Sequence, residues 1–128
     1  MKLDINCVRD LMLYIESDIQ DFSQYSDISE MKEKLDHDEK AIVYTCQKLI
    51  EAGYITGIVE LSDLSESYIC QVHSITFSGH EYLDKIRNKT IFDRVEKAVE
   101  ENGGSVSFQL FGSLCEKALD ILLNKYLG

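Results

Sequence analysis

The feature that most constrains the fold of this chain is an abrupt change of hydrophobic period at Gly53. Before this glycine, apolar residues recur every three to four positions, which is the spacing of amphipathic helices. After it, two segments rich in β-branched residues, 54–61 and 68–75, are joined by a turn-like stretch, which predicts a β-hairpin. Gly53 itself stands where a helix commonly ends in the left-handed conformation. The chain is therefore expected to combine helices with one hairpin.

The same helical period predicts three helices before Gly53 and three after the hairpin. Asp4 and Asp38 suit the caps of the first and third helices, because aspartate accepts hydrogen bonds from exposed amides there. Ser78 and Glu81 fit a capping box at the fourth helix, and Thr90 is expected to cap the fifth. The segment 21–28 is predicted to be a connection. The expected helices are 5–20, 29–35, 38–52, one from Ser78, one from Thr90, and about 107–127.

The order helix, helix, helix, hairpin, helix is that of a winged helix-turn-helix. We therefore expect a mostly helical α+β fold with a winged helix-turn-helix core over about 1–88. Two additional C-terminal helices would form an extension over about 89–128. A chain of 128 residues has the size of a single domain, so residues 1–128 are expected to fold as one.

The chain is strongly acidic, with a net charge of -10 from 23 acidic and 13 basic residues. Nucleic acid is bound mainly by lysine and arginine, so this balance disfavours a polyanionic partner. The four cysteines show no C-x-x-C spacing, and no apolar run predicts a signal peptide or a membrane span. We expect a cytoplasmic protein of a bacterial host with reduced thiols and no membrane partner.

Four phrases of the sequence, taken together, are distinctive: Lys2–Glu16, Gln47–Ile55, Ile75–Asp84 with Ile86-Arg87, and Gly103–Ser105. Together they resemble a family of small proteins that occurs widely in phages and prophages and is known as a domain of unknown function. The resemblance covers nearly the full length and implies a phage or prophage origin, a winged-helix-like core and no catalytic residue. Members often carry His-Leu where this chain has Thr45-Cys46.

In a winged helix-turn-helix, the third helix and the hairpin are the elements that contact DNA. Here residues 28–52 hold six acidic and four basic side chains, and residues 54–73 hold three acidic and no basic ones. A contiguous basic face of Lys32, Lys34, Lys40 and Lys48 would favour DNA, whereas their dispersal would count against it. The candidate recognition helix is Asp38, Glu39, Lys40, Tyr44 and Lys48, and the candidate wing is Ser62, Asp63, Leu64, Ser65 and Glu66.

Two groups of residues could in principle carry chemistry. Cys70 and His73, with His80 nearby, could ligate a metal, but the paired spacings typical of zinc sites are missing, so core and strand roles are favoured. His37 between Asp36 and Asp38 could form an acid–base pair, although a helix cap explains this cluster better. No catalytic motif is present. We expect a protein that is not an enzyme and has no cofactor or metal.

The last helix is apolar over more than one face, which predicts either deep burial or pairing with a second chain. We favour a homodimer through this helix, and the alternative is that it covers the first and fifth helices. The candidate dimer residues are Leu110, Phe111, Leu114, Leu119, Leu122 and Tyr126.

Composition and topology together favour a non-catalytic phage or prophage accessory protein that acts by protein–protein binding. Its acidic surface suits a basic partner, such as a host nucleic-acid-handling protein. The alternative is a DNA-binding transcriptional regulator of winged helix-turn-helix type, which rests on fold analogy. A basic cluster at 85–97 is interleaved with acidic residues and is interpreted as a solvated helix surface.

Overall fold

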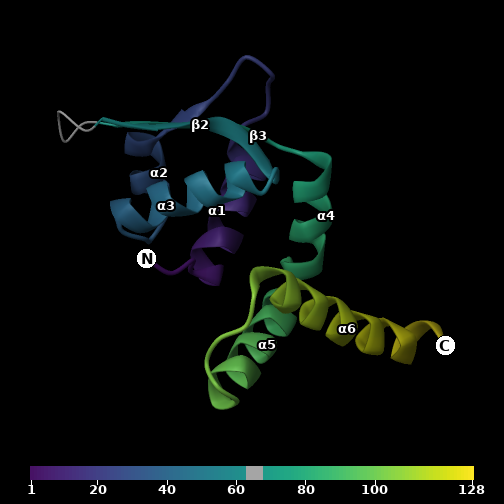
Figure 1. The fold of residues 1–128 in the computed structure, drawn as a ribbon. Coiled ribbons are helices and arrows are strands. Elements are labelled where there is room, and N and C mark those ends of the chain that lie inside the picture. The colour runs from purple at the N-terminus through teal and green to yellow at the C-terminus, as the bar shows by residue number, and fades with distance from the viewer. Residues whose placement is uncertain (63–67) are drawn as a thin grey trace. The chain divides into compact units, whose positions relative to one another are not determined.

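The computed structural model describes residues 1–62 and 68–128 of the chain. Over these residues the fold is mostly helical α+β, as expected, and its element order is consistent with a winged-helix-like arrangement (Figure 1). None of the helices in this part of the chain is long and apolar enough to span a membrane. The elements are α1 (Ile5–Asp18), β1 (Ser26–Asp27), α2 (Ile28–Lys34), α3 (Glu39–Glu51), β2 (Ile55–Leu61), β3 (Tyr68–Ile75), α4 (Phe77–Ile86), α5 (Lys89–Glu101) and α6 (Phe108–Leu127).

The hairpin is confirmed, and it forms part of a three-stranded antiparallel sheet in the order β1-β3-β2. The short strand β1 lies in the segment 21–28, which the sequence predicted to be a connection. Two residues are too few to show a period, and tertiary contacts hold them in place. Ser26 pairs with Val72 of β3, and its buried hydroxyl is hydrogen-bonded to the hydroxyl of Tyr14 at 2.7 Å.

A bulge bends the hairpin at its base, next to α3. Thr56 pairs with Ser74, but Gly57 pairs with Val72, so His73 is the extra residue on β3. A Cβ atom at position 57 would overlap the backbone carbonyl oxygen of Gln71. Glycine is therefore required at position 57 for the two backbones to approach this closely.

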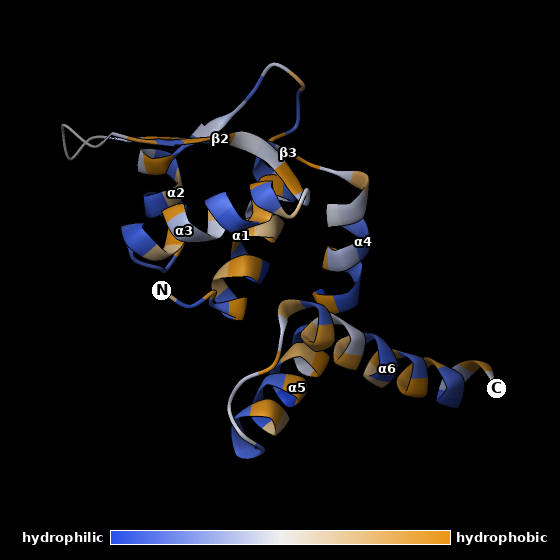
Figure 2. Cartoon of the chain, in the orientation of Figure 1, coloured by the Kyte–Doolittle hydropathy of each residue, from blue (hydrophilic) through white to orange (hydrophobic). Residues whose placement is uncertain are grey.

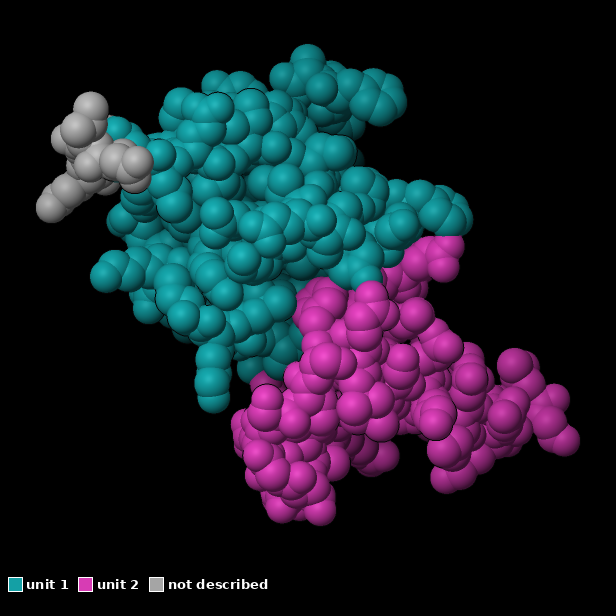
Figure 3. All heavy atoms as spheres, in the orientation of Figure 1, with its two compact units in different colours: residues 1–80 teal, residues 81–128 magenta. Residues whose placement is uncertain are grey.

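The chain packs as two compact units, residues 1–80 and residues 81–128 (Figure 3). The predicted boundary between core and extension lay near residue 88, and the organisation as a single domain stays a prediction. In unit 1 the helices turn their apolar sides inward (Figure 2). The buried residues there include Val8, Leu11, Met12, Ile15, Met31, Ile42, Cys46, Leu49, Ile55 and Val72.

Aromatic contacts organise unit 2. The rings of Phe92 on α5 and Phe111 on α6 meet edge to face, with centroids 5.2 Å apart. Tyr82 of α4 stacks on Phe108 at 4.1 Å, and its hydroxyl donates to the Phe108 carbonyl oxygen at 2.7 Å. A side chain at Gly112 would collide with the Tyr82 ring, so the glycine allows this ring to lie against α6.

The helix ends confirm some sequence predictions and correct others. Asp4 and Asp38 cap α1 and α3 as expected, and Gly53 has the predicted left-handed conformation with φ 77°. The predicted caps of α4 and α5 were wrong, because in each case a residue two positions earlier accepts the amide hydrogen bond. Thr76 rather than Ser78 caps α4, and Asn88 rather than Thr90 caps α5.

Replacement of Thr76 by alanine tests the corrected cap. The Thr76 hydroxyl accepts from the Gly79 amide at 3.0 Å and donates to the Gly53 carbonyl oxygen at 2.5 Å. We expect Thr76→Ala to lower the free energy of unfolding by about 1–2 kcal/mol, measured by urea denaturation. Ser78→Ala is the matched control and should change it by less than about 0.5 kcal/mol. A larger loss of stability in Ser78→Ala than in Thr76→Ala would contradict the Thr76 cap and support a capping box at Ser78.

Candidate functional site

The exposed side of α3 is the face that the sequence proposed for recognition. Two cations on or beside it lie close to carboxylates of α3: Lys32 Nζ of α2 is 3.3 Å from Glu39 Oε1, and Lys48 Nζ of α3 is 3.1 Å from Glu51 Oε2. Lys48 also lies over the Tyr44 ring, 5.3 Å from its centroid. The charges of Lys32 and Lys48 are therefore compensated by acidic side chains of α3.

The remaining recognition residues have structural roles or are isolated. The carboxylate of Asp38 accepts the amide of Ala41 at 2.8 Å, and the Tyr44 hydroxyl donates to the Met1 carbonyl oxygen at 3.3 Å. Lys40 is exposed near the start of α3. The four lysines named for a basic face thus include two, Lys32 and Lys48, whose charge is paired.

The loop end of the hairpin is joined to the start of α3 through Tyr68, whose hydroxyl is hydrogen-bonded to the carboxylate of Glu39. Desolvation and this hydrogen bond raise the pKa of Tyr68 to about 12. The hydrogen bond from Tyr68, with the one from Lys32, lowers the pKa of Glu39. Of the candidate wing, Ser62 is exposed, whereas Asp63, Leu64, Ser65 and Glu66 lie outside the described residues.

The residues considered for metal binding point to different surroundings. Cys70 is buried beside Cys46, and the hydrogen bond from Cys46 lowers the pKa of Cys70. The ring of His73 lies 5.9 Å from that of Tyr25, whereas His80 pairs with Glu16 at 3.8 Å. Within residues 1–62 and 68–128, no three His, Cys, Asp or Glu side chains come together as a metal-binding group.

His37 contacts neither of its acidic neighbours in a catalytic arrangement. Its Nε2 lies 2.8 Å from Oδ2 of Asp10 on α1, while Asp38 caps α3. This contact fastens the turn before α3 to the first helix. It had no local sequence signal, because the two residues are 27 positions apart.

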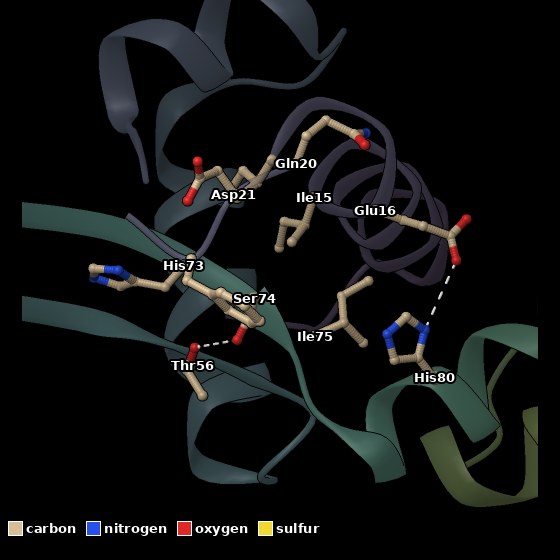
Figure 4. Close-up of a pocket in the computed structure, with 11 residues that line it drawn as sticks. Ile15, Glu16, Gln20, Asp21, Thr56, His73, Ser74, Ile75 and His80 are labelled. Atoms are coloured by element: carbon tan, nitrogen blue, oxygen red, sulfur yellow. Dashed lines mark hydrogen bonds and ion pairs between the residues drawn. The ribbon is translucent and has the colours of Figure 1, made fainter. Parts of the chain in front are cut away.

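A groove of about 520 Å³ runs between the end of α1 and the base of the sheet (Figure 4). Its apolar floor is formed by Ile15, Ile19 and Ile75. At one end His80 pairs with Glu16, and at the other the hydroxyls of Thr56 and Ser74 are hydrogen-bonded at 2.7 Å. In Figure 4 the imidazole of His73 points away from that of His80, so neither ring lies between a hydroxyl and a carboxylate.

Two further hollows, of about 490 and 480 Å³, lie between α1 and α2 and share Tyr14, Asp18 and Lys34. Lys34 is the one basic side chain among the described residues that line them. We name this region the acidic surface, after its five carboxylates. They are Asp10, Asp18, Glu30, Glu33 and Asp36.

Sequence analysis did not identify the acidic surface. The spacing of Glu30 and Glu33 places both on one side of α2, and this signal was available. Asp18 comes from the end of another helix, and only the packing of α1 against the β1–α2 segment brings it to the same hollow. Charge content along the chain therefore indicated an acidic protein without indicating where the charge gathers.

The candidate dimer residues of α6 divide into two groups. Phe111 is buried against Phe92 and supports the helix from within unit 2. Leu114, Leu119 and Leu122 are half-buried, whereas Leu110 and Tyr126 are exposed to 46% and 81%. The second half of α6 thus continues an apolar face beyond the part that is buried.

Comparison with known proteins identifies the family. A family model described as "Hypothetical protein (DUF2513)" matches residues 2–105, so the chain belongs to that family, whose function is unknown. No curated protein and no solved structure matches the chain.

The hydrogen bond between Tyr68 and Glu39 yields a pH prediction. Tyr68 should stay protonated until about pH 12, and Glu39→Gln should lower its pKa by removing the charged acceptor. Because the folded pKa exceeds the usual value of 10.0, the stabilisation from Tyr68 is complete below pH 10 and is lost as the pH rises towards 12. NMR titration of the ring carbons measures this, with Glu51→Gln as the control. An unchanged Tyr68 pKa in Glu39→Gln would disprove the contact.

Proposed function

We propose that this member of the DUF2513 family is a non-catalytic phage or prophage accessory protein. Its winged-helix-like unit would recognise a basic protein, such as a host protein that handles nucleic acid. The observation that carries the proposal is the separation of charge in unit 1. Lys32 on α2 and Lys48 on α3 are paired with Glu39 and Glu51, while five carboxylates gather on the acidic surface around Lys34. The phage setting rests on the resemblance of the sequence.

Electrostatics supports a basic partner over a polyanion. A DNA-binding helix gains affinity when its lysines displace counterions from phosphates. Lys32 and Lys48 would first have to leave Glu39 and Glu51, and the freed carboxylates would then face the phosphates. A partner rich in lysine and arginine would instead be attracted by the carboxylates of the acidic surface. This attraction speeds association and favours the correct orientation.

The arrangement of polar groups in the groove supports a non-catalytic role. A hydroxyl nucleophile needs a base within hydrogen-bonding reach. The Ser74 hydroxyl is hydrogen-bonded to the Thr56 hydroxyl rather than to a base. The imidazole of His80 pairs with the carboxylate of Glu16. The groove therefore offers a surface for a side chain of a partner rather than an activated nucleophile.

The second candidate function is a DNA-binding regulator, which the order of α1–α3, hairpin and α4 favours. Binding of the purified protein to random and genomic duplex DNA at about 50 mM salt separates the two functions, because electrostatic binding is strongest at low salt. We expect no binding in a fluorescence anisotropy assay. Tight binding that weakens steeply with added salt would make the protein a DNA-binding regulator.

Neutralising the acidic surface tests the proposed contact site. The triple variant Asp18→Asn, Glu30→Gln, Glu33→Gln should weaken binding of a short lysine- and arginine-rich peptide by roughly tenfold, at about 0.5 kcal/mol for each lost pair. The control variant Glu81→Gln, Glu100→Gln, Glu101→Gln removes the same charge from exposed positions of unit 2. Titration calorimetry at physiological salt measures both.

The control should bind nearly as tightly as the unaltered protein. Equal weakening by both triple variants would mean that net charge alone attracts the peptide, and the acidic surface would then not be a site. A pull-down from host lysate supplies the second measurement. Basic host proteins should be retained by the unaltered protein and lost by the acidic-surface variant. Retention of no host protein would contradict the proposal.

A further inference from the structure

The second half of α6 carries an apolar face that continues the buried face of its first half. Phe111 and Cys115 are buried within the chain, and the same side of the helix continues through Leu119, Leu122 and Tyr126. From Glu116 onward, no residue of α6 is buried. Figure 2 shows apolar residues recurring along α6 as far as its C-terminal end, beyond its contact with α5. A helix with this pattern is normally covered on the side where the apolar stripe runs.

The exposed side chains on this half-helix are large. Ile121 is exposed to 63%, Leu123 to 44% and Tyr126 to 81%. Large apolar side chains exposed together on one segment mark a protein–protein contact site.

A complementary hollow lies in the same unit, between α5 and α6. It has a volume of about 340 Å³ and a mostly apolar lining. The lining includes Val95, Ala98, Val99, Val106 and Leu114. Unit 2 therefore presents both an apolar helical segment that extends past the hollow and an apolar hollow in which such a segment could lie.

The charge on α6 identifies the kind of partner. In a chain with a net charge of -10, the segment 116–127 holds two acidic and two basic side chains and is neutral. A basic protein or a nucleic acid gains nothing from a neutral apolar face. A second copy of the same segment meets no charge repulsion there. Arg94 at the rim of the hollow and Asp120 on the polar side of α6 are of opposite sign, which also suits reciprocal contact.

We propose that a second copy of this chain covers α6, with the exposed apolar half of each α6 lying against the α6 stripe and the α5–α6 hollow of the other copy. A twofold arrangement uses the stripe and the hollow of both copies at once, as an isologous interface requires. This inference concerns unit 2 and does not depend on the partner proposed for the acidic surface.

Analytical ultracentrifugation of the full chain tests the proposal. The unaltered protein should be a dimer at concentrations on the order of 50 μM. The double variant Leu122→Glu, Tyr126→Glu places two charges on the stripe and should raise the dissociation constant at least about a hundredfold. The double variant Lys117→Glu, Asn124→Glu is the control, because it adds even more negative charge to the polar side of the same helix. It should remain a dimer.

A second variant tests the hollow independently of α6. Ala98 lies on α5 with its side chain exposed in the hollow, and Ala98→Glu should also dissociate the dimer while circular dichroism shows unchanged helix content. A monomeric unaltered protein would overturn the proposal, and so would a dimer that survives the stripe variant. If the stripe variant dissociated the dimer but Ala98→Glu did not, the hollow would not bind α6 of the second copy. That result would contradict the proposed interface.

Discussion

The first unit depends on one junction, at which the end of α3, the start of β2 and the start of α4 meet. The Thr76 hydroxyl donates to the carbonyl oxygen of Gly53 and accepts the amide of Gly79. The Thr76 amide donates to the Tyr54 carbonyl oxygen at 3.0 Å. A side chain at Gly79 would overlap that same carbonyl. The hairpin can therefore leave α3 and return to α4 only because these backbones approach closely, and this approach fixes the position of the sheet beside α3.

The junction has consequences for charge. By holding β3 beside α3, it brings Tyr68 to Glu39, which also pairs with Lys32. Lys32 and Lys48, which lie on or beside the helix that enters the major groove in a DNA-binding protein of this topology, are thus paired before any ligand arrives. Five carboxylates, from α1, α2 and the turn that follows α2, line two adjoining hollows. One scaffold therefore carries a face whose lysines are paired and a second face on which carboxylates outnumber lysines, which is the basis for favouring a protein partner.

The second unit differs from the first in that its notable exposed surface is apolar rather than charged. Aromatic contacts of Tyr82 with Phe108 and of Phe92 with Phe111 hold α4, α5 and the first half of α6 together. The second half of α6 has the same apolar character with nothing buried. Electrostatic recognition by unit 1 and apolar self-association by unit 2 would use separate surfaces, so one chain could present two copies of the acidic surface in a dimer.

The sequence by itself determined the secondary structure and its order. The switch of period at Gly53 located the hairpin, and Asp4, Asp38 and Gly53 marked helix ends, because these signals act over a few neighbouring residues. Tertiary structure decided what depends on residues distant in sequence. Strand β1 exists because Ser26 meets Tyr14 and Val72, and Thr76 rather than Ser78 caps α4 because Gly53 lies within reach of its hydroxyl. Asp18 joins Glu30 and Glu33 for the same reason. Local propensity fixes where a helix or strand can form, but the pairing of side chains and charges depends on which elements pack together.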